Sequence, residues 1–326
     1  MILALETSCD DTCAALVAAD GTIAANVISS QEAHSRFGGV VPEVAARAHL
    51  ELIDHVIAEA FTRAGVGLDD VELVAATRGP GLVGALLVGF SAAKAIAAAR
   101  ELPFAPVDHL AGHVAAAYLR PACFAPPFVA LIASGGHTLL LAVHDRSEPP
   151  EVLARTLDDA AGEAFDKGAR MLGLGYPGGA ALERLAATGD PGAYDFPTGR
   201  GDDFSFAGLK TALLYRTREV DLEDEQVRAD LAASYQRAIV DALVRRVEQA
   251  LERTGLDRLA LGGGVAANGA LRERLGGLGV ELFLPPLALC TDNAAMIACA
   301  AGNVAPLAYP DYLGLDVYAT GEGPLR

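Results

Sequence analysis

Basic residues are scarce in this chain of 326 residues, which has 25 lysines and arginines against 42 aspartates and glutamates and a formal charge of −17. A deficit of this size excludes a generally basic nucleic-acid coat, because phosphate binding depends on positive side chains. The acid excess is steeper in residues 1–163 than in residues 164–326. Any RNA contact is therefore local, or is shared with a partner that supplies positive charge, and the second half suits it better.

The sequence also gives no sign of a secretory signal peptide, a membrane span or a disulfide framework. No basic residue precedes Arg36, so the positive segment that opens a secretory signal peptide is absent and we expect a cytoplasmic protein. The most apolar run, residues 82–99, is rich in alanine and glycine and carries Lys94, which predicts a buried helix and no membrane span. The five cysteines are odd in number and irregularly spaced, as expected for reduced thiols and not for a disulfide framework.

Two segments half a chain apart share one plan. Residues 2–17 (ILALETSCDDTCAALV) and 128–143 (FVALIASGGHTLLLAV) each contain an apolar strand, a small polar turn and a second apolar strand. Ser8 aligns with Ser134, and Thr12 aligns with Thr138. Each predicted hairpin is followed by an extended segment and then by helices. This repetition predicts a duplicated α/β protein whose ligands lie between the two halves.

The stretch 121–127 (PACFAPP) cannot continue a helix and is the best candidate for a hinge. The halves would then be residues 1–120 plus 303–326, and residues 121–302. Hydrophobic periodicity predicts further elements in both halves. We expect helices over 42–64, 82–99, 109–119, 222–254 (one helix or two), 267–275 and 293–301, and strands over 73–77, 104–107 and 259–261.

His109 and His113 are the first candidates for chemistry, because positions i and i+4 share one face of a helix and both rings can reach one ion. A metalloprotease of the zincin type would carry glutamate directly after the first histidine, where this chain has Leu110. The alternative is a pair of ordinary surface histidines. Asp292 is one candidate for a third ligand, although it could equally cap the helix that follows it.

Glycine-rich turns are the second candidate feature. Residues 133–138 (ASGGHT) and 262–264 (GGG), the latter followed by Asn268, would let backbone N–H groups approach a phosphate or a carboxylate. Each could instead be only a tight turn that requires a positive φ. Glu163 and Lys167 fall at i and i+4 and predict an ion pair. That pairing predicts that Asp166 is left without partners in the protein, as a carboxylate able to hold ribose hydroxyls.

Ten motifs occur in order along the chain. They are 6–12 (ETSCDDT), 34–43 (HSRFGGVVPE), 79–82 (GPGL), 109–113 (HLAGH), 134–138 (SGGHT), 162–167 (GEAFDK), 176–179 (YPGG), 204–210 (FSFAGLK), 262–268 (GGGVAAN) and 291–293 (TDN). Together they resemble the bacterial TsaD family of tRNA N6-adenosine threonylcarbamoyltransferases over about residues 2–303. This resemblance implies an α/β fold of the actin/Hsp70/sugar-kinase type, with two RNase-H-like halves and a cleft between them.

The resemblance also implies a set of ligands and partners. One divalent metal, Fe²⁺ with Zn²⁺ as the alternative, would be bound by the residues that match the family's ligands: His109, His113 and Asp292. Threonylcarbamoyl-AMP would lie against Ile132, Ala133, Ser134, Gly135, Gly136, Asp166, Gly179, Glu183 and Asn268. The expected partners are tRNA, a degenerate paralogue of the same fold and a small P-loop ATPase, with no membrane.

The reaction that the resemblance implies is transfer of the threonylcarbamoyl group to the N6 amine of adenosine 37 in tRNAs reading ANN codons, with release of AMP. That amine is a poor nucleophile, so the enzyme must align the reactants and polarise the carbonyl. Asp10 is our candidate for receiving the amine proton; its alternative role is to orient the first hairpin turn. A metallopeptidase would explain the paired histidines, and a small-molecule kinase of the same fold would explain the glycine turns.

Overall fold

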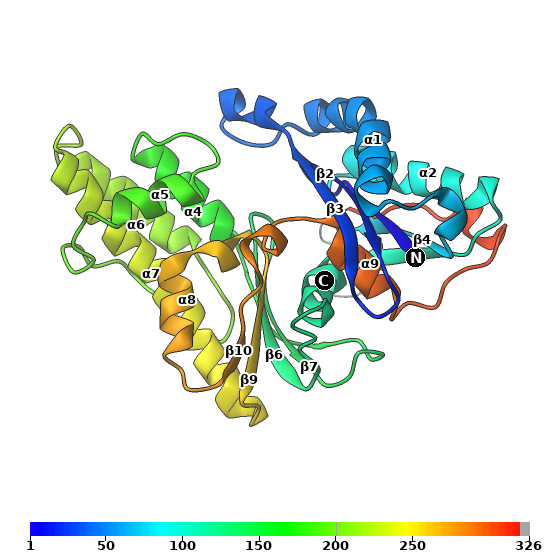
Figure 1. Ribbon diagram of the computed structural model, residues 1–326. Coiled ribbons are helices and arrows are strands. Elements are labelled where there is room, and N and C mark those ends of the chain that lie inside the picture. The colour runs from blue at the N-terminus through cyan, green and yellow to red at the C-terminus, as the bar shows by residue number, and fades with distance from the viewer. Residues whose placement is uncertain (200, 320–326) are drawn as a thin grey trace. The chain divides into compact units, whose positions relative to one another are not determined.

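The computed structural model describes residues 1–199 and 201–319. The chain divides into two units, Met1–Ala125 with Thr291–Arg326, and Pro126–Cys290. Each unit is built on a five-stranded sheet, and Figure 1 shows the first sheet beginning at the amino terminus. The two predicted hairpins are therefore the starting strands of two separate sheets.

The sheet of the first unit has the order β3-β2-β1-β4-β5. Its strands are β1 (Ile2–Glu6), β2 (Asp11–Val17), β3 (Ile23–Ser30), β4 (Leu73–Gly79) and β5 (Phe104–Asp108). Strands β1, β2 and β3 form an antiparallel meander, whereas β4 and β5 run parallel to β1. Because the parallel strands point the same way, the turn after β1 and the loop after β4 lie at one edge of the sheet.

The second unit repeats this topology strand for strand. Its order is β10-β9-β6-β7-β8, with β6 antiparallel to β7, β7 antiparallel to β8, and β9 and β10 parallel to β6. The strands are β6 (Phe128–Ala133), β7 (Thr138–Val143), β8 (Glu151–Arg155), β9 (Arg258–Gly262) and β10 (Glu281–Phe283). The predicted duplication is confirmed at the level of both sheets.

Four α-helices belong to the first unit: α1 (Pro42–Ala64), α2 (Val83–Ala99), α3 (His109–Ala115) and α9 (Ala294–Ala301). Side chains alternate across a strand, and Leu3 and Leu5 of β1 point into one apolar cluster with Ile53 of α1 and Phe90 of α2. Helix α9 packs against β1, β2 and α3. The His-bearing helix α3 is thus supported by another helix as well as by the sheet.

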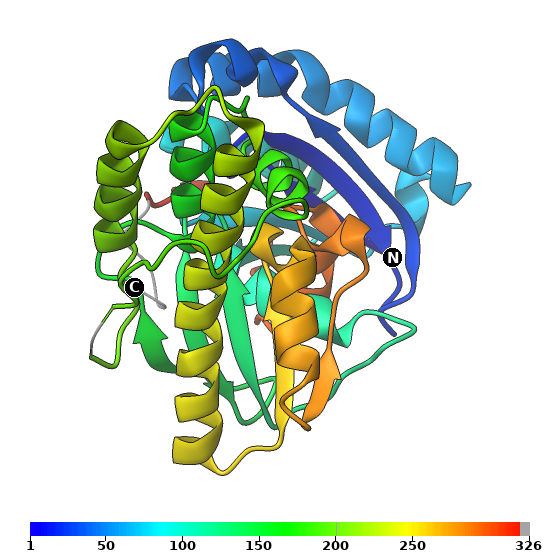
Figure 2. The same cartoon turned by 90° about the vertical axis from the view of Figure 1, so that its left-hand side faces the viewer.

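The second unit contains α4 (Ala161–Met171), α5 (Gly179–Ala186), α6 (Ala207–Glu219), α7 (Glu225–Thr254) and α8 (Gly269–Gly276). Figure 2 shows the long helix α7 running beside α8 over one face of the second sheet. Its leucine and isoleucine positions form one cluster with the leucines of β6 and β9. The predicted segment 222–254 is a single helix. The helix predicted over 267–275 begins later, because residues Gly264–Ala267 form a 3-10 turn.

The boundaries of the units differ from the predicted ones at both places where the chain passes from one unit to the other. Residues 121–125 and 291–302 belong to the first unit, whereas the sequence placed them in the second. The first stretch is tied back by the Phe124 amide, which donates to the Ala117 carbonyl at 2.7 Å. Helix α9 is fixed by Asn26 of β3, whose Oδ1 accepts from the Ala295 amide. A helix near the end of the second repeat therefore completes the first unit.

Two expectations about absent features can be checked directly. In the ranges 1–199 and 201–319, none of the helices is long and apolar enough to cross a membrane. All five cysteines lie in these ranges, and none of them is in a disulfide.

A candidate metal centre and a candidate nucleotide site

Helix α3 brings the two predicted histidines together. Asp108 caps its first turn, because the Asp108 Oδ1 accepts from the amides of Leu110 and Ala111 at 2.9 and 3.1 Å. The rings of His109 and His113 follow with centroids 4.7 Å apart. Both histidines are buried, so the alternative of two exposed surface histidines is wrong.

Asp292 reaches the same point from the segment before α9. Its Oδ1 lies 3.5 Å from the His109 Nε2 and 3.3 Å from the His113 Nε2. One ligand atom from each of the three residues falls within 4.8 Å of the others. Asp292 does not cap α9, because the cap is the neighbouring Asn293, whose Oδ1 accepts from the Met296 amide.

Close packing of two helices explains why these residues meet. A Cβ on Gly112, between the two histidines, would lie 2.7 Å from the Ile297 Cδ1 of α9. Glycine at this position leaves room for the Ile297 and Met296 side chains and so allows α3 to pack closely on α9. The Asp292 carboxylate precedes α9 directly and therefore arrives beside the histidine face of α3.

The hydrogen bonds of the histidines test whether a metal fits. The His109 Nδ1 lies 2.9 Å from the Glu6 Oε2 and donates to that carboxylate, which directs Nε2 toward Asp292. Both ring nitrogens of His113 are buried, and although the Asp292 Oδ1 lies 3.3 Å from Nε2, neither nitrogen has a hydrogen-bond partner among the described residues. A buried imidazole without partners is costly unless another group occupies its nitrogen. Two histidines and one carboxylate are a donor set that suits Fe²⁺ or Zn²⁺, so the residues fit a divalent metal.

Glu6 is a candidate functional residue that the pattern of the sequence did not indicate. It is fully buried at the end of β1 and also accepts from the Thr77 Oγ1 at 2.5 Å and from the Ser8 amide. Carboxylates that accept from a ligating histidine fix its tautomer and strengthen it as a ligand. The position of Glu6 in the motif 6–12 was visible in the sequence, but its partner is 103 residues away.

Negative charge gathers around this centre. Burial lowers the pKa of His109, but the carboxylates of Asp292 and Glu6 outweigh burial and raise the pKa to about 9. Burial raises the pKa of the Cys9 thiol, and Asp10 and Asp292 add to that effect. The pKa of Asp10 is also raised, mainly by burial. The surroundings favour a cation at the histidine pair and a more basic Asp10 carboxylate.

The residues expected to hold the adenylate all lie in the second unit. Strand pairing and hydrogen bonds join the segments that carry them into a closed ring of segments. The hairpin turn is closed by the Ser134 Oγ, which accepts from the His137 amide at 3.1 Å, and the Ser134 carbonyl accepts from the Gly162 amide at the start of α4. Ala133 ends β6, next to Ile132, which pairs with Gly262 of β9. The predicted turn and the glycine loop are therefore neighbours.

The other half of the ring runs through α4, α5 and α8. The Asp166 Oδ1 accepts from the amides of Gly178 and Gly179 at 2.7 and 3.2 Å. The Glu183 Oε1 accepts from the Gly269 amide at 2.7 Å, and Asn268 caps α8. The prediction that Asp166 is left without partners is wrong, because it holds the start of α5; the predicted pair of Lys167 and Glu163 is present at 2.7 Å.

The backbone requires glycine at position 263 but leaves space for a side chain at position 264. Gly263 has a φ of +86°, and a Cβ there would lie 2.3 Å from the Ala133 carbonyl oxygen. At Gly264, no described atom lies within 4 Å of such a Cβ. The first glycine is required by the turn itself, whereas the second leaves open space that a ligand can use.

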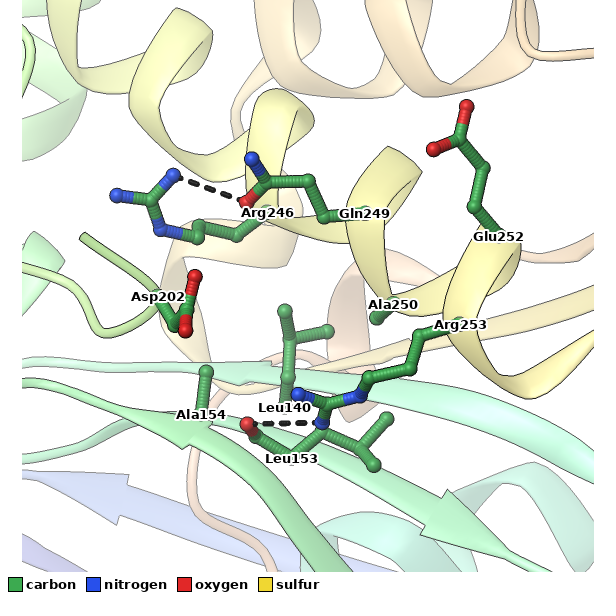
Figure 3. Close-up of a pocket in the computed structure, with 9 residues that line it drawn as sticks. All are labelled: Leu140, Leu153, Ala154, Asp202, Arg246, Gln249, Ala250, Glu252 and Arg253. Atoms are coloured by element: carbon green, nitrogen blue, oxygen red, sulfur yellow. Dashed lines mark hydrogen bonds between the residues drawn. The ribbon is translucent and has the colours of Figure 1, made fainter. Parts of the chain in front are cut away.

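A separate hollow of about 430 Å³ lies between α7 and the strands β7 and β8. Figure 3 shows Arg246 and Arg253 at its walls, with Arg253 bonded to the carbonyl of Leu153. None of the residues predicted from the sequence lines it.

Comparison with solved structures defines the class of protein. The chain is similar to HypF of T. kodakarensis, with a TM-score of 0.63 and 15% identity over 92% of this chain and 47% of that one. It is also similar to component A of the (R)-2-hydroxyglutaryl-CoA dehydratase of Acidaminococcus fermentans, with a TM-score of 0.55 and 18% identity over 93% and 95% of the two chains. The fold is that of the actin/Hsp70/sugar-kinase class.

Sequence comparison defines the family within that class. The family model for TsaD, the tRNA N6-adenosine threonylcarbamoyltransferase, matches residues 22–299. A protein of this name from Pelobacter propionicus is 50% identical over 99% of this chain and 97% of its own length. Another, from Anaeromyxobacter sp., is 53% identical over 92% of each chain. The chain belongs to the TsaD family of tRNA-modifying transferases.

Proposed function

We propose that this protein transfers the threonylcarbamoyl group from threonylcarbamoyl-AMP to the N6 amine of adenosine 37 in tRNAs reading ANN codons, with release of AMP. Membership of a family whose curated relatives carry this activity in their names supports the proposal. The match covers almost the whole length of those relatives. Nothing in the comparisons favours a peptidase or a small-molecule kinase.

The first unit supplies the metal ligands in this proposal. His109, His113 and Asp292 would hold one divalent ion, Fe²⁺ in the first place and Zn²⁺ as the alternative. Such an ion supplies Lewis acidity that polarises a carbonyl. Glu6 holds the ring of His109, and Asp10 receives the proton that the amine loses. The raised pKa of Asp10 supports that role, because a more basic carboxylate takes up a proton more readily.

The second unit supplies the adenylate site. Ile132 and Ala133 at the end of β6, with Ser134, Gly135 and Gly136 of the turn, would line the phosphate. No described atom lies within 4 Å of a Cβ placed on either glycine, so a ligand can approach the backbone there. Asp166, Gly179, Glu183 and Asn268 would form the remaining wall. Asp166 accepts from the amides of Gly178 and Gly179 at the start of α5, and Glu183 accepts from the Gly269 amide; these hydrogen bonds keep that wall in one arrangement.

Partners follow from the charge of the chain. With a net charge of −17, it needs positive surface from elsewhere to hold tRNA at physiological salt. A degenerate paralogue of the same fold and a small P-loop ATPase are the proposed partners. A place in the cytoplasm follows from the tRNA substrate.

The substitution Asp292→Asn tests the metal centre and the activity together. It keeps the size of the side chain and leaves the cap of α9 on Asn293, so the fold should be retained. We expect bound metal to be lost and formation of the modified nucleoside to fall by at least about 100-fold. Nucleoside mass spectrometry of tRNA from a depleted strain complemented with each variant measures the product, and elemental analysis measures the metal.

The control is Asp311→Asn, which changes an exposed carboxylate of the same unit. It should restore the modified nucleoside like the unchanged chain. If the unchanged chain fails to restore the nucleoside, the proposed activity is wrong. If Asp292→Asn keeps its metal, the ligand assignment is wrong even where the activity is confirmed.

A further inference from the structure

Residues 311–318, here called the carboxyl-terminal strap, are anchored to the first unit at several points. Tyr312 is fully buried, and its hydroxyl donates to the Leu102 carbonyl at 3.1 Å. The Lys94 Nζ of α2 donates to the Leu315 carbonyl at 2.8 Å. The Arg78 Nε donates to the Asp316 carbonyl at 2.8 Å. The strap is therefore a fixed part of this unit.

Tyr318, at the end of the strap, lies directly on the loop after β4. Its amide donates to the Arg78 carbonyl at 3.1 Å, and the Arg78 guanidinium lies 5.8 Å from the centre of its ring. A Cβ on Gly79 would lie 2.5 Å from the Tyr318 Cδ2. Glycine at position 79 makes the room that the tyrosine ring needs. Ring and backbone are both held, so the direction of the hydroxyl is determined.

That hydroxyl ends on the residue that caps the histidine helix. The Tyr318 Oη donates to the Asp108 Oδ2 at 2.6 Å. The other oxygen, Asp108 Oδ1, accepts from the amides of Leu110 and Ala111. One carboxylate is thus shared between the strap and the first turn of α3, in which His109 is the first residue.

We propose that Tyr318 is a positioning residue for the metal centre: it locks the Asp108 carboxylate, and through it the first turn of α3, so that His109 and His113 present their Nε2 atoms together. The inference rests on the proposed metal ligands. Without the hydroxyl, the carboxylate can rotate about its side-chain bonds and the cap can open. Small displacements of a ligand weaken metal binding, because coordination depends strongly on distance and direction.

The substitution Tyr318→Phe removes only the hydroxyl and leaves the ring on Gly79. We expect the dissociation constant for Fe²⁺ or Zn²⁺, measured by competition with a chelator, to rise by about tenfold. This is the lower end of the range for groups that contact a ligand directly. The melting temperature of the metal-free protein should fall by no more than the loss of one hydrogen bond explains.

Tyr312→Phe is the matched control, because it removes a hydroxyl from the same strap at a bond that does not involve Asp108. We expect it to lower the melting temperature and to leave the metal dissociation constant unchanged. Equal weakening of metal binding by both substitutions would mean that the strap acts only through general stability, and would overturn the proposal. Unchanged metal binding in Tyr318→Phe would overturn it as well.

A measurement without metal separates this inference from the proposed metal centre. In the metal-free protein, the amides of Leu110 and Ala111 should exchange with solvent about tenfold faster in Tyr318→Phe than in the unchanged chain. Faster exchange together with no metal uptake by the unchanged chain would retain the positioning of α3 and overturn the metal centre. Equal exchange in the two proteins would overturn the positioning role.

Discussion

The two units share one strand topology, but their equivalent turns carry opposite chemistry. In the turn after β1, Ser8 is buried, Cys9 and Asp10 are half-buried, and carboxylates lie nearby. After β6, the turn at Gly135 and Gly136 is exposed. The same pattern of strand pairing is therefore compatible with different ligands, and a few residues of the turn determine which kind of ligand fits. The first turn favours a cation, and the second suits a phosphate.

Equivalent residues show the same divergence at the level of single atoms. The Ser8 Oγ lies 3.3 Å from the His109 Nδ1, whereas the Ser134 Oγ closes its own turn. Ser8 can contact His109 because α3 directly follows β5, and both lie at the end of the sheet where the turn after β1 also lies. In the second unit, the helix that follows β10 is α9, which packs on the first unit instead. The duplication thus ends asymmetrically, and among the described residues the group that could hold a metal ion, His109, His113 and Asp292, belongs to the first unit.

The largest expected effect comes from the glycine loop of the second unit. Gly263→Val should destabilise the protein by at least about 3 kcal/mol, because it combines a positive φ with a Cβ that would overlap the Ala133 carbonyl. Gly264→Ala is the control, since its Cβ meets open space, and it should change stability by less than about 1 kcal/mol. Urea denaturation measures both.

The KM for threonylcarbamoyl-AMP then shows whether the glycine loop also binds the nucleotide or has only a structural role. If the loop lines the nucleotide, Gly264→Ala should raise the KM for threonylcarbamoyl-AMP several-fold in a protein of normal stability. An unchanged KM would place the nucleotide elsewhere in the second unit.

A histidine substitution in the first unit has the next largest effect. His113→Ala should remove the bound metal and lower the transfer rate by at least about 100-fold. The metal-free protein should melt no lower than the unchanged chain, because the substitution also removes two buried nitrogens without hydrogen-bond partners among the described residues. His144→Ala, at an exposed position of the second unit, is the control. Full metal occupancy in His113→Ala would contradict the assignment.

The smallest expected effects come from the two equivalent threonines. The Thr138 Oγ1 accepts from the Ala161 amide at 2.8 Å, and the Thr12 Oγ1 lies 2.8 Å from the His49 Nδ1. The His49 Nε2 donates to the Cys9 carbonyl at 3.1 Å, and burial lowers the pKa of the ring, so Nδ1 accepts from the Thr12 hydroxyl. Thr12→Val and Thr138→Val should each cost about 1–2 kcal/mol, since each leaves a buried polar atom unpaired.

Calorimetry of the two valine variants beside Thr12→Ser and Thr138→Ser, which keep the hydroxyl, measures these costs. If the free energy of unfolding falls in only one of the two valine variants, the threonine hydroxyl has kept its structural role in only that unit.

Local patterns predicted most of the elements, because they depend on neighbouring residues. The helix over Pro42–Ala64 and the hairpins around Ser8 and Ser134 were all confirmed. The first unit differs from the predicted one by residues 121–125 and 291–302, the latter including α9, because nothing in the spacing of residues 291–302 states which sheet they will contact. The predicted Asp166 without partners was wrong for the same reason, since its partners lie twelve and thirteen residues along the chain.

The sequence alone determined the duplicated α/β architecture, the pairing of His109 with His113 and the family, because each is written in the order and spacing of residues along the chain. The tertiary structure brings Asp292 to the histidines, as the family resemblance implied, and it alone decided that Glu6 orients one of them and that Tyr318 reaches the cap of α3. These three contacts join residues more than 100 positions apart, and they depend on close packing at Gly112 and Gly79. Such packing is a property of the whole core, so it cannot be deduced from any one segment.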